Sequence, residues 1–196
     1  MKGIVLCGGQ SLRMGRDKGL LIGSKKITWA QQAFSLLSKL DIEVAFSVNK
    51  NQFQIYKRVF FSHRLLADSR ELKIAGPLLG ILTSHIEYPK EDLLVLACDM
   101  IEMNLEVLQF LNSQYVQNPG FDAYIFKDGN LPEPLCAIYS AAGLKGITEK
   151  SEKKQLEKFS LMYALDQLNV FEIPIKPDWK KTFTNMNTVS DLQKAY

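Results

Sequence analysis

Short apolar runs alternate along this chain with longer stretches in which apolar residues recur at helical spacing. The runs GIVLC (3–7), IEVAFSVN (42–49) and DLLVLACD (92–99) are typical of strands, and the first and last are apolar enough to be buried on both faces of a sheet. Between the first two runs, residues 28–40 place apolar side chains on one helical face, with Thr28 suited to cap that helix. Strands separated by helices of this length indicate βαβ units and a parallel sheet.

The same pattern continues to Pro119 and then changes. We expect further helices at 51–60, 76–88 and 105–116 and a strand at 64–68. Beyond Pro119, strand-like runs at 121–129 and 133–140 are joined by a turn, which predicts an antiparallel extension. The remaining expected elements are a polar helix or lobe at 150–168, a strand at 169–175 and a closing helix within 185–196.

Composition narrows the class of protein. The 196 residues are 46% hydrophobic and 23% charged, which is ordinary for a globular chain with a full core. A net charge of +3 is too small to indicate a nucleic-acid surface, and no apolar run reaches the roughly 18 residues of a membrane span. The three cysteines have no metal-ligand spacing, which fits reduced thiols. We therefore expect a cytoplasmic protein without nucleic-acid or membrane partners.

The loop that follows the first strand combines bare backbone with positive charge. Gly8 and Gly9 expose N–H groups without a side chain, and Arg13, Arg16 and Lys18 follow within about ten residues. This combination suits a polyphosphate ligand. The loop matches neither the GxGxxG dinucleotide pattern nor the GxxxxGK[ST] phosphate loop. A charged turn that happens to contain glycine is the alternative.

Polar side chains stand at the ends of three expected strands. Asp99 ends the most hydrophobic run, Asp68 ends the strand at 64–68, and Asn49 ends the second strand. The carboxyl ends of parallel strands form the edge where α/β proteins bind ligands, and a carboxylate there is suited to Mg²⁺. A helix cap for Asp99, a turn for Asp68, and either for Asn49 are the structural alternatives. The run AGPLLG (75–80) predicts a tight helix start that is suited to cover a flat base. The alternative is a turn that serves packing alone.

The stretch LCGGQSLRMGRDKGLL (6–21) resembles the signature LAGGxSxRMGxDKxLL of the molybdenum cofactor guanylyltransferases and their nucleotidyltransferase relatives. The resemblance extends in order through AGPLLGI (75–81), CDM (98–100), EPLCAIY (133–139) and NMNT (185–188). It implies a Rossmann-like three-layer α/β sandwich with a mostly parallel central sheet. It also implies one domain over 1–196, with a nucleotide-binding half at 1–100 and an acceptor half at 101–196.

The reaction implied by the resemblance is transfer of GMP from GTP to Mo-molybdopterin, which gives the guanine dinucleotide cofactor and pyrophosphate with Mg²⁺ present. Transient contact with molybdoenzymes or cofactor-delivery proteins would follow. By matching position, the residues implied are Leu6, Cys7 and Gly8 for guanine through their backbone, Lys18 for phosphate, Asn49 and Asp68 for base and ribose, Asp99 for GTP phosphate and Mg²⁺, Arg13 for the triphosphate charge, and Asn185 and Asn187 for molybdopterin. Lys18, Asp99 and Arg13 would be the catalytic groups.

Three positions depart from the family pattern. Cys7 stands where the family has alanine, and Ile101 and Val189 stand where prolines are usual. None of these changes removes a charged group. Two other functions stay open at this point. One is a cytidylyltransferase, or another nucleotidyltransferase, of the same fold. The other is a non-catalytic adaptor that binds nucleotide or molybdopterin.

Overall fold

A computed structural model describes residues 1–8, 17–23, 26–153, 155–184 and 186. Its strands are β1 (Lys2–Leu6), β2 (Val44–Val48), β3 (Arg64–Ala67), β4 (Leu93–Ala97), β5 (Ala123–Asp128), β6 (Leu131–Tyr139) and β7 (Val170–Pro174). Its α-helices are α1 (Trp29–Ser38), α2 (Lys50–Val59), α3 (Pro77–Glu87), α4 (Leu105–Gln117), α5 (Ala141–Glu152) and α6 (Leu161–Leu165). Two 3₁₀ helices, η1 (Lys18–Leu20) and η2 (Pro177–Phe183), complete the described elements.

These strands form one sheet in the order β3-β2-β1-β4-β6-β5-β7. Strands β3, β2, β1 and β4 run parallel to one another, and β7 runs parallel to β5. Strand β6 is antiparallel to both β4 and β5. The expected mostly parallel α/β sheet with an antiparallel portion is therefore confirmed.

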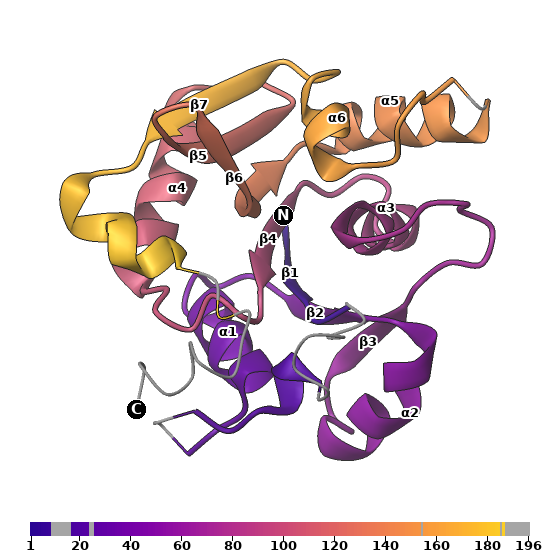
Figure 1. Ribbon diagram of the computed structural model, residues 1–196, viewed down its shortest axis with the longest axis vertical. Coiled ribbons are helices and arrows are strands. Elements are labelled where there is room, and N and C mark those ends of the chain that lie inside the picture. Colours follow the sequence, from indigo (N-terminus) through magenta and orange to yellow (C-terminus); the bar gives the residue numbers. More distant parts are fainter. Residues whose placement is uncertain (9–16, 24–25, 154, 185, 187–196) are drawn as a thin grey trace.

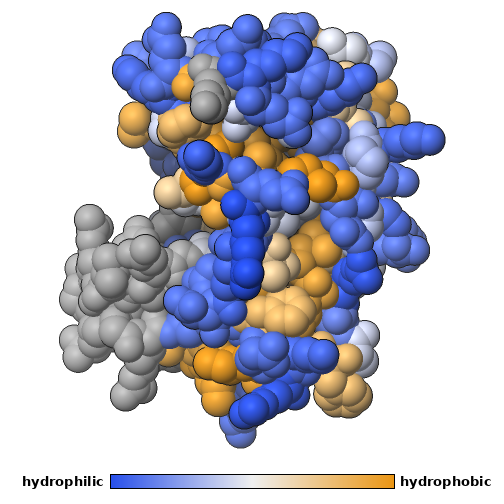
Figure 2. All heavy atoms as spheres, turned by 90° about the vertical axis from the view of Figure 1, so that its right-hand side faces the viewer, coloured by the Kyte–Doolittle hydropathy of each residue, from blue (hydrophilic) through white to orange (hydrophobic). Residues whose placement is uncertain are grey.

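Helices cover both faces of the sheet and make a three-layer sandwich (Figure 1). Helices α1, α2 and α4 enclose one apolar core, and α3, α5 and α6 enclose the other. Figure 2 views the side of the molecule that carries α3. Hydrophobic residues gather across the middle of this face, and hydrophilic residues cover the part above it, where α5 and α6 lie.

Local sequence explains where several helices begin. The Thr28 hydroxyl accepts a hydrogen bond from Gln31 N at 3.2 Å and caps α1. Pro77 occupies the first turn of α3, where its missing N–H leaves no bond unmade. Both starts agree with the sequence. Within the described residues, no helix combines the length and apolar character needed to cross a membrane.

Helix α6 falls within the range 150–168, where a polar helix or lobe is expected, whereas helix α5 lies mostly before that range. It begins at Ala141, where the Ser140 hydroxyl accepts from Gly143 N at 3.0 Å. The sequence does not predict this start, because Gly143 and Gly146 lie in the first half of the helix and glycine is a poor helix former. Gly143 has a packing reason, since a side chain there would come within 2.7 Å of Asp122 Cβ. The expected closing helix at 185–196 lies outside the described residues except for Met186.

Candidate active site

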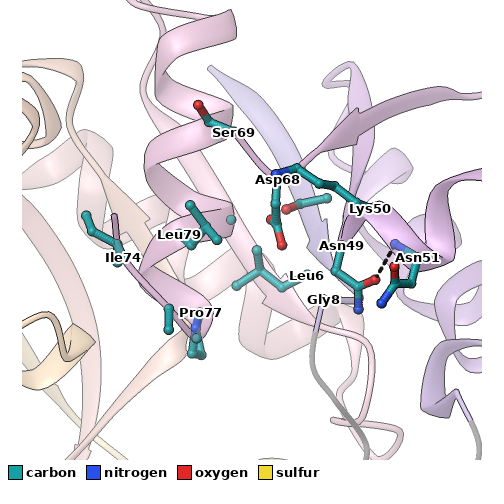
Figure 3. A pocket seen from close by; sticks show the side chains of 14 residues that line it. Leu6, Gly8, Asn49, Lys50, Asn51, Asp68, Ser69, Ile74, Pro77 and Leu79 are labelled. Carbon is teal, nitrogen blue, oxygen red and sulfur yellow. Dashed lines mark hydrogen bonds between the residues drawn. The ribbon is translucent and has the colours of Figure 1, made fainter. Parts of the chain in front are cut away.

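A cavity of about 650 Å³ opens at the carboxyl ends of β1, β2 and β3, against the first turns of α3 (Figure 3). Its lining consists of Leu6, Gly8, Ser47, Asn49, Lys50, Asn51, Asp68, Ser69, Ile74, Ala75, Gly76, Pro77, Leu79 and Gly80. Apolar side chains from β1 and α3 face polar groups from the ends of β2 and β3. This arrangement suits a ligand with a flat apolar ring and several hydrogen-bonding atoms.

Asn49 lines this cavity and also caps α2. Its Oδ1 accepts hydrogen bonds from Asn51 N at 2.9 Å and Gln52 N at 3.0 Å (Figure 3 draws the first). The Gln52 side chain returns the contact, because its Oε1 accepts from Asn49 N at 3.0 Å. The capping alternative raised by the sequence is therefore correct for Asn49, and it leaves the residue at the cavity wall.

Asp68 is the acidic group of the cavity. Its backbone N–H donates to Val48 O at 3.0 Å, which fixes the residue at the end of β3. Burial raises the pKa of Asp68 to about 6 from its ordinary value of 3.8, while the ammonium group of Lys50 acts in the opposite direction. Burial disfavours the charged form of this carboxylate, and hydrogen-bond donors of a ligand would stabilise that form.

The AGPLLG run forms the apolar wall of the cavity. Gly76 adopts a φ of 74°, a backbone conformation that favours glycine, and the chain then turns directly into α3 at Pro77. One turn later, a methyl group on Gly80 would lie 2.6 Å from Ser47 Oγ and 3.1 Å from Leu6 Cδ2. Gly80 therefore allows α3 to approach the ends of β1 and β2 closely, and this approach sets the width of the cavity.

Lys18 and Asp99 meet at the same edge of the sheet. Lys18 Nζ donates to Asp99 Oδ2 at 2.8 Å, although 81 positions separate the two residues. Each side chain is only 17% exposed. Asp99 follows β4, whose neighbour β1 ends at the cavity, so the ion pair lies one strand away from the cavity's lining. A largely buried lysine ammonium group and a carboxylate lie here at the edge of the sheet where ligands bind. The pair is well placed to bind a phosphate group and its counter-ion.

The C-terminal part of the chain also reaches Asp99. Met186 N donates to the Asp99 carbonyl at 3.2 Å. The Met186 side chain is buried with Trp29, and Leu21 and Ile101 pack against them. The isoleucine that stands in place of proline is thus part of a small apolar cluster beside the ion pair. Gln32 Nε2 donates to the Ile101 carbonyl at 2.6 Å and holds that loop.

Asp99 has the chemistry of a Mg²⁺ ligand. Within the part of the chain that the structure describes, no group of three or more His, Cys, Asp or Glu side chains could hold a metal alone. Mg²⁺ needs no such group, because it commonly takes one or two carboxylates and completes its shell with phosphate oxygens and water. A single carboxylate beside a lysine therefore fits a metal that arrives with a polyphosphate.

The structure sorts the residues named from the sequence. Leu6, Gly8, Asn49 and Asp68 line the cavity, and Lys18 contacts Asp99. Cys7 is different, because its side chain is buried in the core and its backbone groups are already engaged. Its N–H donates to Ser47 O at 2.9 Å, and its carbonyl accepts from Gln52 Nε2 at 3.0 Å. The remaining expected site residues, Arg13, Asn185 and Asn187, lie outside the described residues.

Sequence reasoning missed four side chains at this edge. Lys50 lines the cavity and acts electrostatically on Asp68. In the sequence it looks like any lysine at the start of a helix. Asp17, Gln52 and Tyr56 form a hydrogen-bonded group next to Lys18. The spacing of Asn49 and Gln52 is that of a capping box, so this part of the group carried a readable signal.

Comparisons with known proteins find matches over most of the chain. A family model described as the MobA-like NTP transferase domain matches residues 3–167. Over 190 residues the chain is 30% identical to a molybdenum cofactor biosynthesis bifunctional protein from Synechocystis, covering 96% of this chain and 52% of the relative. The chain thus spans about half the length of that relative. A probable molybdenum cofactor guanylyltransferase from Peptoclostridium acidaminophilum is 28% identical, with 97% of this chain and 86% of the relative covered.

Among solved structures, the chain resembles the molybdopterin-guanine dinucleotide biosynthesis protein A of Archaeoglobus fulgidus. The TM-score is 0.80 at 24% identity, with 100% of this chain and 96% of that chain covered. This likeness supports the fold, including the layer arrangement and the mixed sheet.

Proposed function

Because the chain belongs to the family of MobA-like NTP transferase domains, we propose that this nucleotidyltransferase acts on GTP and Mo-molybdopterin. It transfers GMP to the terminal phosphate of the acceptor, forming molybdopterin guanine dinucleotide and releasing pyrophosphate. Relatives that are matched over most of their length and named as molybdenum cofactor guanylyltransferases support this proposal. Its strongest support within the chain is the Lys18–Asp99 contact of 2.8 Å beside a cavity of nucleoside size.

In this proposal the cavity takes the guanosine part of GTP. Leu6 and the first turns of α3 cover the flat faces of the base, and Gly8 lets the nucleotide approach the backbone. Asn49 and Asp68 are placed to bind base and ribose atoms. The half-buried Asp68 carboxylate accepts from donor groups of the nucleotide, and Lys50 balances its charge.

The chemical step joins two anions. An oxygen of the molybdopterin phosphate forms a bond to the α-phosphorus of GTP, and the bond from that phosphorus to the bridging oxygen breaks as pyrophosphate leaves. The attacking phosphate is already ionised, so no general base is needed. The role of the protein is to position the reactants and to offset negative charge. Lys18 supplies a cation for the phosphates, with Arg13 as a second one from the same loop.

The proposed cofactor is Mg²⁺, held by Asp99 and by oxygens of the nucleotide. When bound, it would offset the negative charge of the phosphates. Asp99 Oδ2 accepts from Lys18 Nζ, so the same carboxylate orients the lysine before nucleotide arrives. Lys18 is then in place to move its hydrogen bond to a phosphate oxygen.

The acceptor half is proposed to be residues 101–196, with the nucleotide half at 1–100. Asn185 and Asn187 are the proposed molybdopterin contacts. They flank Met186 in the sequence, and the Met186 N–H donates to the Asp99 carbonyl at 3.2 Å. The proposed compartment is the cytoplasm, where the free, buried cysteines Cys7, Cys98 and Cys136 stay reduced.

The test is incubation of the purified protein with GTP, Mg²⁺ and Mo-molybdopterin, followed by detection of the dinucleotide and of pyrophosphate. Parallel reactions with CTP decide the choice of base. Product with GTP and not with CTP supports the proposal, and the reverse result assigns a cytidylyltransferase. GTP binding without pyrophosphate release in the presence of molybdopterin would assign the non-catalytic adaptor and refute the transferase.

A further inference from the structure

The carboxylate next to Lys18 is held at both of its oxygens. Asp17 Oδ1 accepts hydrogen bonds from Gly19 N and from the Tyr56 hydroxyl, each at 3.0 Å. Asp17 Oδ2 accepts from Gln52 Nε2 at 2.8 Å. Two of the three donors come from α2, a helix whose N-cap residue, Asn49, lies 32 positions after Asp17. The backbone immediately before Lys18 is therefore tied to α2.

Gln52 connects three segments of the edge. Besides Asp17, its Nε2 donates to the Cys7 carbonyl at 3.0 Å, just after β1. Its Oε1 accepts from Asn49 N at 3.0 Å, just after β2. The side chain is only 7% exposed, so these hydrogen bonds form away from bulk water, where each has a larger effect. One amide thus fixes Asp17 relative to two strand ends that border the cavity.

Tyr56 reaches Asp17 through a gap that Gly19 leaves open. The tyrosine is fully buried, with 0% of its surface exposed. A methyl group on Gly19 would collide with the Tyr56 hydroxyl, whereas the ring carbon Cζ would be 3.3 Å away. Burial raises the pKa of Tyr56 well above its ordinary value of 10.0, so the hydroxyl remains a donor to Asp17. Gly19 and Tyr56 are therefore a matched pair.

This network determines where the Lys18 side chain starts. Asp17 caps η1, which begins at Lys18, and the lysine then extends to Asp99 at 2.8 Å. We propose that Gln52 and Tyr56 are positioning residues for nucleotidyl transfer, which hold Asp17 and thereby place Lys18 at Asp99. The inference rests on the proposed function, because it assigns the two residues to the same phosphate site. Neither residue needs to touch the substrate.

Tyr56→Phe tests the proposal with a minimal change. It removes one hydroxyl and keeps the ring, and a misplacement of about 1 Å at a reacting group lowers turnover by up to about 100-fold. We expect kcat to fall about 10-fold or more, with KM for GTP changed less than kcat. Tyr115→Phe is the matched control, because the Tyr115 hydroxyl donates to the Asp92 carboxylate at 2.5 Å at the opposite, amino end of β4.

The control separates positioning from stability. Both variants lose one tyrosine–carboxylate hydrogen bond and are expected to lose similar thermal stability. Only Tyr56→Phe is expected to lose turnover. If the two variants retain the same fraction of wild-type kcat, Tyr56 has a structural role alone and the proposal is wrong.

Gly19→Ala supplies a second discriminating series. The single variant is expected to lose both stability and turnover, since the added methyl displaces the Tyr56 hydroxyl. In Gly19→Ala/Tyr56→Phe the collision is relieved, so thermal stability should return toward that of Tyr56→Phe. Turnover should remain at the Tyr56→Phe level because Asp17 still lacks its donor. Recovery of wild-type turnover in the double variant would overturn the assignment.

One readout is independent of catalysis. Lysines of the intact protein are labelled by reductive ¹³C-dimethylation, and the Lys18 resonance is identified by its loss in Lys18→Arg. Asp99→Asn marks the resonance position expected when the pair is broken. In Tyr56→Phe and Gln52→Leu the resonance should move toward that position. If it stays at the wild-type position in both, positioning is refuted. If it moves while the wild type forms no dinucleotide, positioning stands and the proposed reaction fails.

Discussion

Asp68→Asn should make the protein more stable at neutral pH while weakening nucleotide binding. Burial raises the pKa of the native Asp68 carboxyl to about 6 from 3.8, so the native state disfavours the charged form. Protonated Asp68 is accommodated without this cost. The carboxylate therefore lowers the free energy of unfolding progressively as pH rises from about 4 to about 6, and the loss is complete above that range.

The size of this effect follows from the same two values. A difference of about two in pKa corresponds to about 3 kcal/mol, at about 1.4 kcal/mol for each pH unit. Asp68 lies at an open cavity, and solvent screening there reduces the expected effect to about 1–2 kcal/mol. For a chain of this size that is a rise in Tm of about 2–8 °C for the asparagine variant near pH 7.5. Below about pH 4 the two proteins should be nearly equal.

The assay is urea unfolding of wild type and Asp68→Asn at pH 4.5 and pH 8. The control is Asp166→Asn, which changes the same charge at an exposed position just after α6 and should stay within about 0.5 kcal/mol of wild type at both pH values. A stability gain by Asp68→Asn at pH 8 that shrinks at pH 4.5 supports the reasoning. A loss of stability at pH 8, or a gain independent of pH, would refute it.

Three further outcomes are expected at the same edge. Lys18→Ala and Asp99→Ala should each lower kcat by at least about 100-fold while folding normally, measured by pyrophosphate release and circular dichroism; near-normal rates in both would reject their assignment. Gly80→Ala should cost about 1–3 kcal/mol and weaken GTP binding, because its methyl group would lie 2.6 Å from Ser47 Oγ. Gly146→Ala is its control, since nothing lies within 4 Å of the added group and helix propensity predicts a gain of about 0.5–1 kcal/mol; equal losses in both would contradict the packing argument. Removal of divalent metal with EDTA should abolish turnover, and added Mg²⁺ should restore it; unchanged turnover in EDTA would exclude the role given to Asp99.

Much of the edge could be anticipated because strand order constrains where residues fall. Once β1, β2, β3 and β4 are recognised as parallel, the residues after them must share one edge, which brings Asn49, Asp68 and Asp99 together with the loop after Leu6. The apolar runs identify these strands because central parallel strands are buried on both faces. The fold prediction is confirmed for this reason.

What the sequence could not provide is side-chain partnership. Nothing in the string DKG indicates that Asp17 faces α2 while Lys18 faces Asp99, since adjacent residues often point in different directions. The sequence also gives no sign of the Gly19–Tyr56 pair, because that contact depends on the distance between two elements in space. Asn49 illustrates a different limit. One side chain caps a helix and lines a cavity, and a reading of either role alone is incomplete.

The most direct test of the proposed reaction follows the phosphorus atoms of GTP. The protein is incubated with Mg²⁺, Mo-molybdopterin and either [α-³²P]GTP or [γ-³²P]GTP. The account predicts that the α label appears in the molybdopterin dinucleotide and the γ label in pyrophosphate, in equal amounts. Release of the γ label as orthophosphate, or α label recovered only in GDP or GMP, would contradict it.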